Sequence, residues 1–190
     1  MNELPAYMEE AWEELIDGKV VLMSPRPSFN HNVVAENIFF LFKQALRGKP
    51  CRPIADGTDL YLSEKERYVP DGMIVCERSK LKGNGVHGAP DLVVEVLSPG
   101  TAKNDRGHKK KAYEQHGVKE YWIVNPADRT LEQYLLEDGT LELHEVYAIH
   151  PDYMLEKMTP EERAAIKTEV VCGLSDALVL PLVDIFGDLI

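Results

Sequence analysis

PDLVVEVLSP, residues 90–99, is the stretch of sequence that decides the fold we expect. Leucine and valine fill most positions between Asp91 and Ser98, which is typical of a strand buried on both faces. Glu95 interrupts this apolar run, and desolvating a carboxylate without a partner is costly. The sequence therefore predicts that Glu95 meets a cation, either a metal ion or a lysine.

The segment that follows, residues 101–113, is the most basic part of an otherwise acidic chain. It reads TAKNDRGHKKKAY and predicts a helix that ends at Gly117, a residue type favoured just beyond helix C-termini. Helical spacing places Asp105, Lys109 and Tyr113 on one face, and it turns Lys110 away. If that face packs over the strand, Lys109 can reach the buried carboxylate.

Length and composition predict a single globular domain over residues 1–190. The hydrophobic fraction is 44%, and the charged fraction is 28%. A formal net charge of -11 argues against a general nucleic-acid coat, since such proteins carry a basic surplus. An enzyme that holds phosphates at one local site stays compatible with this charge.

The cysteines and the N-terminus predict a cytoplasmic protein. Cys51, Cys76 and Cys172 are odd in number, lie far apart and form no CxxC pair, so we expect reduced, buried thiols. No signal peptide is visible at the N-terminus. No apolar run approaches the roughly 18 residues of a membrane helix, so we expect no membrane partner.

The remaining pattern predicts an α/β (α+β) fold, with a mixed central sheet flanked by helices and an added β-hairpin. We expect helices over 8–15, 30–46, 101–116 and 160–167, strands over 19–23, 52–62, 68–76, 91–97, 121–124, 130–136 and 141–147, a loop over 80–89, and an apolar segment over 178–186. Strands 91–97 and 121–124 should be parallel central neighbours, because a helix connects them. The last two strands should form the hairpin.

Strand geometry selects which carboxylates can act together. Asp91 shares a strand face with Glu95, but the four residues between them span roughly 13 Å. Asp71 begins another strand, and adjacent strands lie about 4.8 Å apart, so Asp71 and Glu95 can converge on one hard cation. Two carboxylates that hold Mg²⁺ (or Mn²⁺) beside Lys109 are suited to phosphodiester hydrolysis.

This pattern resembles the PD-(D/E)XK nuclease superfamily, which has an Asp on one strand, a Glu-x-Lys position on the next and a helix behind them. The wider pattern resembles the Uma-two family of restriction-endonuclease-like proteins. The residues that carry the resemblance are Ile16-Asp17-Gly18, Met23-Ser24-Pro25, His31, Pro70-Asp71, the run 89–99, Asp105, Lys109, Tyr113 and the run 117–124. The likeness covers nearly the whole chain, and its part from Glu95 to Val124 is specific.

The resemblance implies a metal-dependent endonuclease that acts on DNA as a homodimer. It places Asp71 and Glu95 at the acidic ligand positions, and Leu97 at the position of the superfamily's strand lysine, so that Lys109 on the following helix is the match. The implied catalytic residues are Asp71, Glu95 and Lys109, with His31, Glu36, Asp105 and Tyr113 in support and Lys103, Arg106 and Lys110 as nucleic-acid contacts.

Other interpretations stay open. Leu97 and the net charge of -11 favour a degenerate nuclease fold that serves as a nucleic-acid-binding or regulatory module. Glu95 could be a structural ion-pair partner of a lysine or arginine, and Asp71 could be a turn cap. His31 could be a helix-entry residue, and Tyr113 could be a core side chain.

Overall fold

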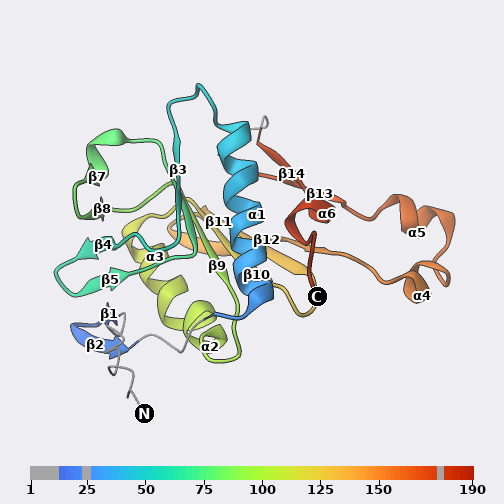
Figure 1. Cartoon of the computed structure of the whole chain (residues 1–190), viewed down its shortest axis with the longest axis horizontal. Coiled ribbons are helices and arrows are strands. Elements are labelled where there is room, and N and C mark those ends of the chain that lie inside the picture. Colours follow the sequence, from blue (N-terminus) through green and yellow to red (C-terminus); the bar gives the residue numbers. More distant parts are fainter. Residues whose placement is uncertain (1–12, 23–26, 175–177) are drawn as a thin grey trace, which may run out of the picture.

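The computed structural model describes residues 13–22, 27–174 and 178–190 (Figure 1). Its elements are β1 (Glu13–Ile16), β2 (Lys19–Leu22), α1 (Phe29–Ala45), β3 (Arg52–Ala55), β4 (Leu60–Ser63), β5 (Glu66–Tyr68), β6 (Gly72–Val75), η1 (Arg78–Lys80), β7 (Leu81–Lys82), β8 (Gly85–His87), β9 (Leu92–Val96), α2 (Ala102–Asn104), η2 (Asp105–Lys109), α3 (Lys110–His116), β10 (Glu120–Asn125), β11 (Thr130–Glu137), β12 (Thr140–Ala148), α4 (Asp152–Leu155), α5 (Pro160–Ala164), β13 (Glu169–Val171), β14 (Val179–Pro181) and α6 (Leu182–Ile185).

Within the described ranges, the central sheet has the strand order β12-β11-β10-β9-β6-β3. A second sheet has the order β2-β1-β5-β4-β8-β7, and β13 pairs with β14. The expected α+β fold with a mixed central sheet, flanking helices and the added β11–β12 hairpin is confirmed. The prediction of one domain over 1–190 stays a prediction.

Strands β9 and β10 lie side by side at the centre of the sheet. They run parallel, with Val94 opposite Trp122, and β9 pairs antiparallel with β6, with Val94 opposite Gly72. The predicted parallel neighbours are therefore confirmed, and the apolar character of PDLVVEVLSP is explained by burial of β9 on both faces.

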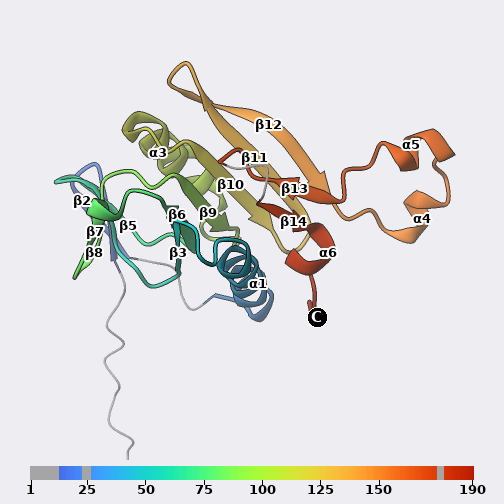
Figure 2. The ribbon, with the colours of Figure 1, turned by 90° about the horizontal axis from the view of Figure 1, so that it is seen from above.

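The two faces of the central sheet support separate cores. Helix α1 covers one face, where Phe42 contacts Trp122 with ring centroids 5.3 Å apart. Helix α3 covers the opposite face, where Tyr113 packs against Tyr121 at 5.1 Å (Figure 2). Because strand side chains alternate between faces, Glu95 points to the α3 side.

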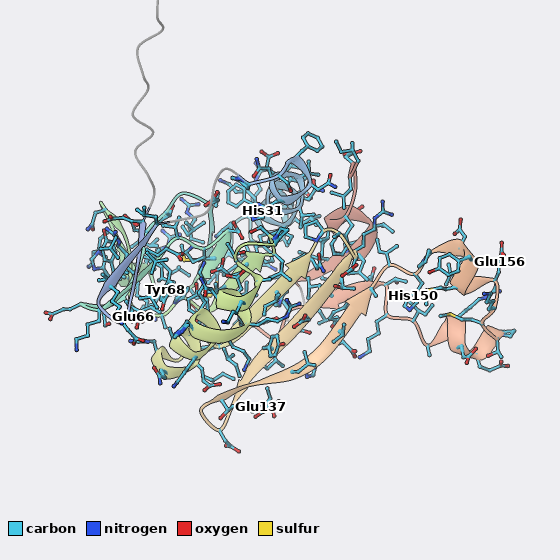
Figure 3. All side chains as sticks on the ribbon, turned by 90° about the horizontal axis from the view of Figure 1, so that it is seen from below. His31, Glu66, Tyr68, Glu137, His150 and Glu156 are labelled. Atoms are coloured by element: carbon cyan, nitrogen blue, oxygen red, sulfur yellow. A yellow bond between two sulfur atoms is a disulfide. The ribbon has the colours of Figure 1, made fainter. Side chains whose placement is uncertain are left out.

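Helix α1 is confirmed with nearly the predicted bounds. Ser28 is its N-cap, and the Ser28 side chain accepts a hydrogen bond from His31 N. Gly48 follows the helix with φ 79°, a conformation that glycine adopts at low cost. This start places His31 near one end of the central sheet (Figure 3).

The helix expected over 8–15 is wrong where the structure describes it, since β1 begins at Glu13. Residues 8–12 of that prediction and Met23-Ser24-Pro25 of the motif lie outside the described ranges. Asp17 and Gly18, with φ 51° and 74°, form a two-residue hairpin turn between β1 and β2. A turn of this kind needs a strand before it as well as after it.

Two further expectations are corrected in the middle of the chain. The strand expected over 52–62 is two strands, β3 and β4, which belong to different sheets. The loop expected over 80–89 contains the short β7–β8 hairpin. Long-range pairing assigns β3 and β4 to different sheets, and the local sequence pattern carries no signal for it. The β7–β8 pairing is local, and the Gly83-Asn84 turn between the two strands is a hairpin signal that the prediction missed.

The prediction of three reduced thiols is wrong for two of them, because Cys51 and Cys76 form a disulfide. Arg52 pairs with Val75 across the antiparallel β3–β6 ladder, so the preceding and following cysteines face each other. Cys172 is buried, as expected, and its Sγ donates to Glu120 Oε2 at 3.1 Å.

The segment with α4 and α5 projects from the body, and Figure 3 shows His150 and Glu156 there, far from His31. The predicted helix over 160–167 is confirmed over Pro160–Ala164, with a capping box between Thr159 and Glu162. Among the described residues, no helix combines the length and apolar character needed to cross a membrane.

Candidate active site

A buried lysine lies at the centre of the candidate site. Lys109 is 4% exposed at the end of η2. Its Nζ lies 2.9 Å from Glu14 Oε1, 3.1 Å from Glu95 Oε1 and 3.7 Å from Asp105 Oδ1. Side chains from β1, β9 and the helical segment therefore surround one ammonium group.

The register predicted for the basic helix is confirmed. Lys109 donates to Glu95 Oε1, and Tyr113, four residues later, donates to the same oxygen at 2.7 Å. Lys110 points elsewhere, because its Nζ donates to Leu141 O at 2.6 Å. The lysine that approaches the buried carboxylate is thus the one that helical spacing selected.

A π-helical segment precedes α3. η2 covers Asp105–Lys109 and places Asp105 and Lys109 on the buried side. Asp105 is 1% exposed, and its Oδ1 has no hydrogen-bond partner among the described residues. Tyr121 OH donates to Asp105 O at 3.0 Å, which helps to hold the segment against β10. Single π turns inside helices are frequent at functional sites.

Asp71 lies immediately before β6, on the strand next to Glu95. Gly72 pairs with Val94, so Asp71 lies beside Glu95 across the ladder, and Asp71 Oδ2 accepts from Val96 N at 2.6 Å. The prediction that strand pairing brings these two carboxylates side by side is confirmed, but Asp71 precedes β6 and does not begin it. Whether they bind a metal stays a prediction.

His31 and Asp56 extend the site beyond Asp71. His31 Nε2 lies 3.4 Å from Asp71 Oδ1. Burial opposes a charge on His31, but the hydrogen bond and charge of Asp71 outweigh it and raise the His31 pKa. Burial and repulsion from Asp71 raise the pKa of Asp56, which follows β3. The predicted strand over 52–62 placed Asp56 inside a strand, so the sequence analysis did not identify it as a site residue. In the structure, β3 ends at Ala55.

The carboxylates in this cluster outnumber the lysine. Burial raises the pKa of Glu95 well above its ordinary value, and repulsion from Asp105, Asp71 and Glu14 adds to this, while Lys109 opposes it. Burial also raises the pKa of Asp105. Burial disfavours charge on Lys109, but Glu95, Glu14 and Asp105 together raise its pKa, so the ammonium persists. The site carries a negative excess that suits a hard divalent cation.

Other predicted residues do not join the cluster. Glu36 is exposed on α1, and Lys103 is exposed on α2. Arg106 binds Glu132 Oε1 at 2.6 Å, and Lys110 is engaged with Leu141 O. Asp91 pairs with Lys119 at 2.7 Å, consistent with its exclusion from the candidate pair.

Glu14 is the main residue that sequence reasoning missed. It was placed in a helix, yet it is a strand residue 6% exposed, with Oε1 accepting from Val69 N at 3.2 Å and from Lys109. The signal that could have found it is the Asp17-Gly18 turn, which implies a strand on both sides. On that strand, Glu14 and Ile16 share one face and are both buried.

A mixed sheet with two carboxylates on adjacent strands, and a lysine delivered from the helix behind them, defines the class of restriction-endonuclease-like proteins. The chain matches the family model Uma2, described as "Putative restriction endonuclease", over residues 2–167, and it belongs to that family.

Two comparisons accompany this assignment. The chain is 29% identical over 127 residues to an uncharacterized protein of Synechocystis sp. (strain ATCC 27184 / PCC 6803 / Kazusa), and the match covers 66% of each protein. The fold resembles the crystal structure of "a putative nuclease belonging to DUF820 from Anabaena variabilis ATCC 29413", with a TM-score of 0.67 and 18% identity. That match covers 93% of this chain and 90% of the other, and at this identity it establishes the fold alone.

Proposed function

We propose that this protein is a metal-dependent endonuclease that hydrolyses phosphodiester bonds in DNA. The observation that carries the proposal is the buried Lys109 held between Glu14 and Glu95, beside Asp71 on the adjacent strand. We also propose that it acts as a homodimer, which the family resemblance suggests. The Cys51–Cys76 disulfide removes the cysteine argument for a cytoplasmic location.

Asp71 and Glu95 are the residues that would hold Mg²⁺ or Mn²⁺. No group of three His, Cys, Asp or Glu side chains in the described part of the chain is arranged to hold an ion. Magnesium commonly takes only one or two protein carboxylates and keeps several waters, so this pair fits it. The negative excess and the unpartnered Asp105 Oδ1 support the same assignment. When bound, the ion would polarise the phosphate and lower the pKa of a water molecule.

Lys109 would stabilise the charge that develops on the phosphate. Its ammonium group has three hydrogens, of which Glu14 and Glu95 accept two. The remaining donor is free to meet a non-bridging phosphate oxygen in the transition state. Tyr113 holds Glu95 in place from the same helix face. Leu97, at the strand-lysine position, is part of the apolar core on the α3 side.

The proposed DNA contacts lie on the basic segment that follows β9. Lys103 is exposed and can reach a phosphate directly. Arg106 can contact a phosphate only if it releases Glu132, and Lys110 only if it releases Leu141 O. We therefore assign a direct contact to Lys103 and conditional contacts to the other two.

A second candidate function is a nucleic-acid-binding or regulatory module without catalysis. The side chain of Lys109 is only 5% exposed and is already paired, which favours such a closed arrangement. Leu97 at the strand-lysine position favours it as well.

A plasmid-nicking assay separates the two functions. The full chain is incubated with supercoiled plasmid and Mg²⁺, Mn²⁺ or EDTA. The proposal expects nicking with either ion and none with EDTA, and it expects Glu95→Gln to abolish nicking. DNA binding without any nicking in either metal would favour the regulatory module, and nicking that survives EDTA would contradict metal dependence.

A further inference from the structure

The β1–β2 hairpin reaches the candidate site through the side chain of Glu14. Glu14 comes from the second sheet, and its carboxylate lies 2.9 Å from Lys109 Nζ. The hairpin is fixed to β5 by the pairing of Leu15 with Arg67, and Gly18 N donates to Lys65 O at 3.0 Å. The Glu14 carboxylate is thus held in place by a hairpin that pairs with β5.

We infer that Glu14 is the positioning residue for Lys109. The inference rests on the proposed function, because it assigns a role in orienting the ammonium group towards the scissile phosphate. A lysine side chain has a flexible four-carbon stem and three rotatable donors, so two fixed acceptors are needed to aim the third. Glu14 and Glu95 are those acceptors.

Glu14 is better placed for this role than the other groups around Lys109. Asp105 lies at 3.7 Å, beyond hydrogen-bond distance. Tyr113 is engaged with Glu95, to which its hydroxyl donates. Glu95 Oε1 is shared with Tyr113, and the proposed function also assigns Glu95 to the metal. Glu14 Oε1 is shared as well, with Val69 N, but Glu14 carries no metal assignment.

The backbone fixes the Glu14 carboxylate. Its Oε1 accepts from Val69 N at 3.2 Å as well as from Lys109. Val69 leads from β5 into the segment that carries Asp71, so one carboxylate connects the hairpin, the lysine and the chain that leads to the proposed metal position. Groups that orient metal ligands through hydrogen bonds typically contribute 10–100-fold to activity, and we expect the same scale for a group that orients Lys109.

The test uses Glu14→Gln, which keeps an oxygen that accepts from Val69 N and replaces the charge-assisted hydrogen bond to Lys109 by a neutral one of about half the strength. Glu13→Gln is the matched control, because Glu13 is the adjacent residue on the same strand and is half exposed in a pair with Arg67 at 2.9 Å. In Mg²⁺ nicking assays we expect Glu14→Gln to lower kcat about 10–100-fold with KM unchanged. Glu13→Gln should keep the wild-type kcat. In a Lys109→Ala background, Glu14→Gln should lower the rate no further.

A second readout is independent of catalysis. Nitrogen-15 lysine NMR of the full chain reports hydrogen exchange of the Lys109 ammonium, which should be slow while two buried carboxylates hold it. Glu14→Gln should accelerate this exchange, and Glu13→Gln should leave it unchanged. If Glu14→Gln does not fold, Glu14→Asp replaces it with the same expected results, because the shorter side chain withdraws the carboxylate.

The outcomes separate this inference from the proposed function. Wild-type kcat in Glu14→Gln, combined with loss of nicking in Lys109→Ala, overturns the positioning role and leaves the nuclease proposal standing. Absence of nicking by the wild-type chain in both metals overturns the nuclease proposal and, with it, the catalytic role of Glu14. Unchanged ammonium exchange in Glu14→Gln overturns the positioning role in either case.

Discussion

Glu95 and Glu120 are buried carboxylates on neighbouring parallel strands, and their surroundings are opposite. Glu120 is wholly buried, and its Oε1 accepts from Trp122 Nε1 and Gln133 Nε2, each at 2.6 Å. Its Oε2 accepts from Cys172 Sγ. Every donor is neutral, and each carboxylate oxygen is satisfied, so this network stabilises a single packing arrangement.

Glu95 lies in an environment dominated by charge. It shares the ammonium of Lys109 with Glu14, and Asp105 lies nearby with an oxygen that has no hydrogen-bond partner in the described chain. A pKa raised by burial and by the neighbouring carboxylates marks a site that is short of cations. Burial of a carboxylate alone therefore does not indicate a reactive site, whereas burial with uncompensated charge does.

The largest expected effect concerns the lysine. Lys109→Ala should lower the nicking rate roughly 10²–10³-fold, the usual loss when one donor to the transition state is removed. Lys110→Ala should retain turnover, because Lys110 Nζ donates to Leu141 O. Glu120→Gln should also retain turnover once folded protein is compared. Equal losses in Lys109→Ala and Glu120→Gln would remove the distinction between the two carboxylates.

An intermediate effect is expected from metal binding. Mn²⁺ at about 100 times its Kd should stabilise the protein by about 2.7 kcal/mol, seen as a rise in Tm. Asp71→Asn should abolish the rise, while the Asn side chain keeps an acceptor for Val96 N. Asp91→Asn is the matched control, because Asp91 is paired with Lys119. A rise that persists in both Asp71→Asn and Glu95→Gln would place the ion elsewhere.

The smallest expected effect is on the free energy of unfolding, measured in denaturant and compared between Glu120→Gln and Glu95→Gln. Glu120→Gln presents an amide N–H to groups that are themselves donors, so it should cost about 1–3 kcal/mol at neutral pH. Glu95→Gln should raise the free energy of unfolding at neutral pH, because it removes a charge from a site with negative excess.

The pH dependence checks this difference. The folded protein holds the Glu95 proton more tightly than the unfolded chain, since burial raises the Glu95 pKa above its ordinary 4.5. Wild-type stability should then fall as the pH rises above that value, and Glu95→Gln should lose this fall. The two proteins should converge below pH 4.5. A constant difference across the pH range would contradict the assigned cause.

Local patterns predicted the parts of the site that lie on regular elements. The apolar run identified β9, and helical spacing placed Lys109 and Tyr113 on the buried side. Both signals depend on residues a few positions apart. The pairing of β9 with β10 followed from the helix between them.

The rest of the site depends on long-range pairing. Glu14 reaches Lys109 only because β1 pairs with β5 in a sheet that the local sequence does not reveal. The Cys51–Cys76 disulfide depends on the β3–β6 ladder in the same way. The sequence predicts that Arg106 contacts nucleic acid. In the structure Arg106 binds Glu132 on β11, which lies two strands away from β9 in the sheet.

The hydrogen bond from Val96 N to Asp71 has a consequence for which residues evolution retains at position 71. Asp71 supplies a side-chain oxygen where the β6 ladder has not yet begun, so the sheet itself benefits from this aspartate whether or not the protein cuts DNA. A lineage that abandons catalysis would then still be selected to keep a side-chain acceptor here, either aspartate or asparagine. Among descendants of such a protein, asparagine at position 71 would record lost activity with an intact sheet, whereas survival of the aspartate would record only that the sheet still folds.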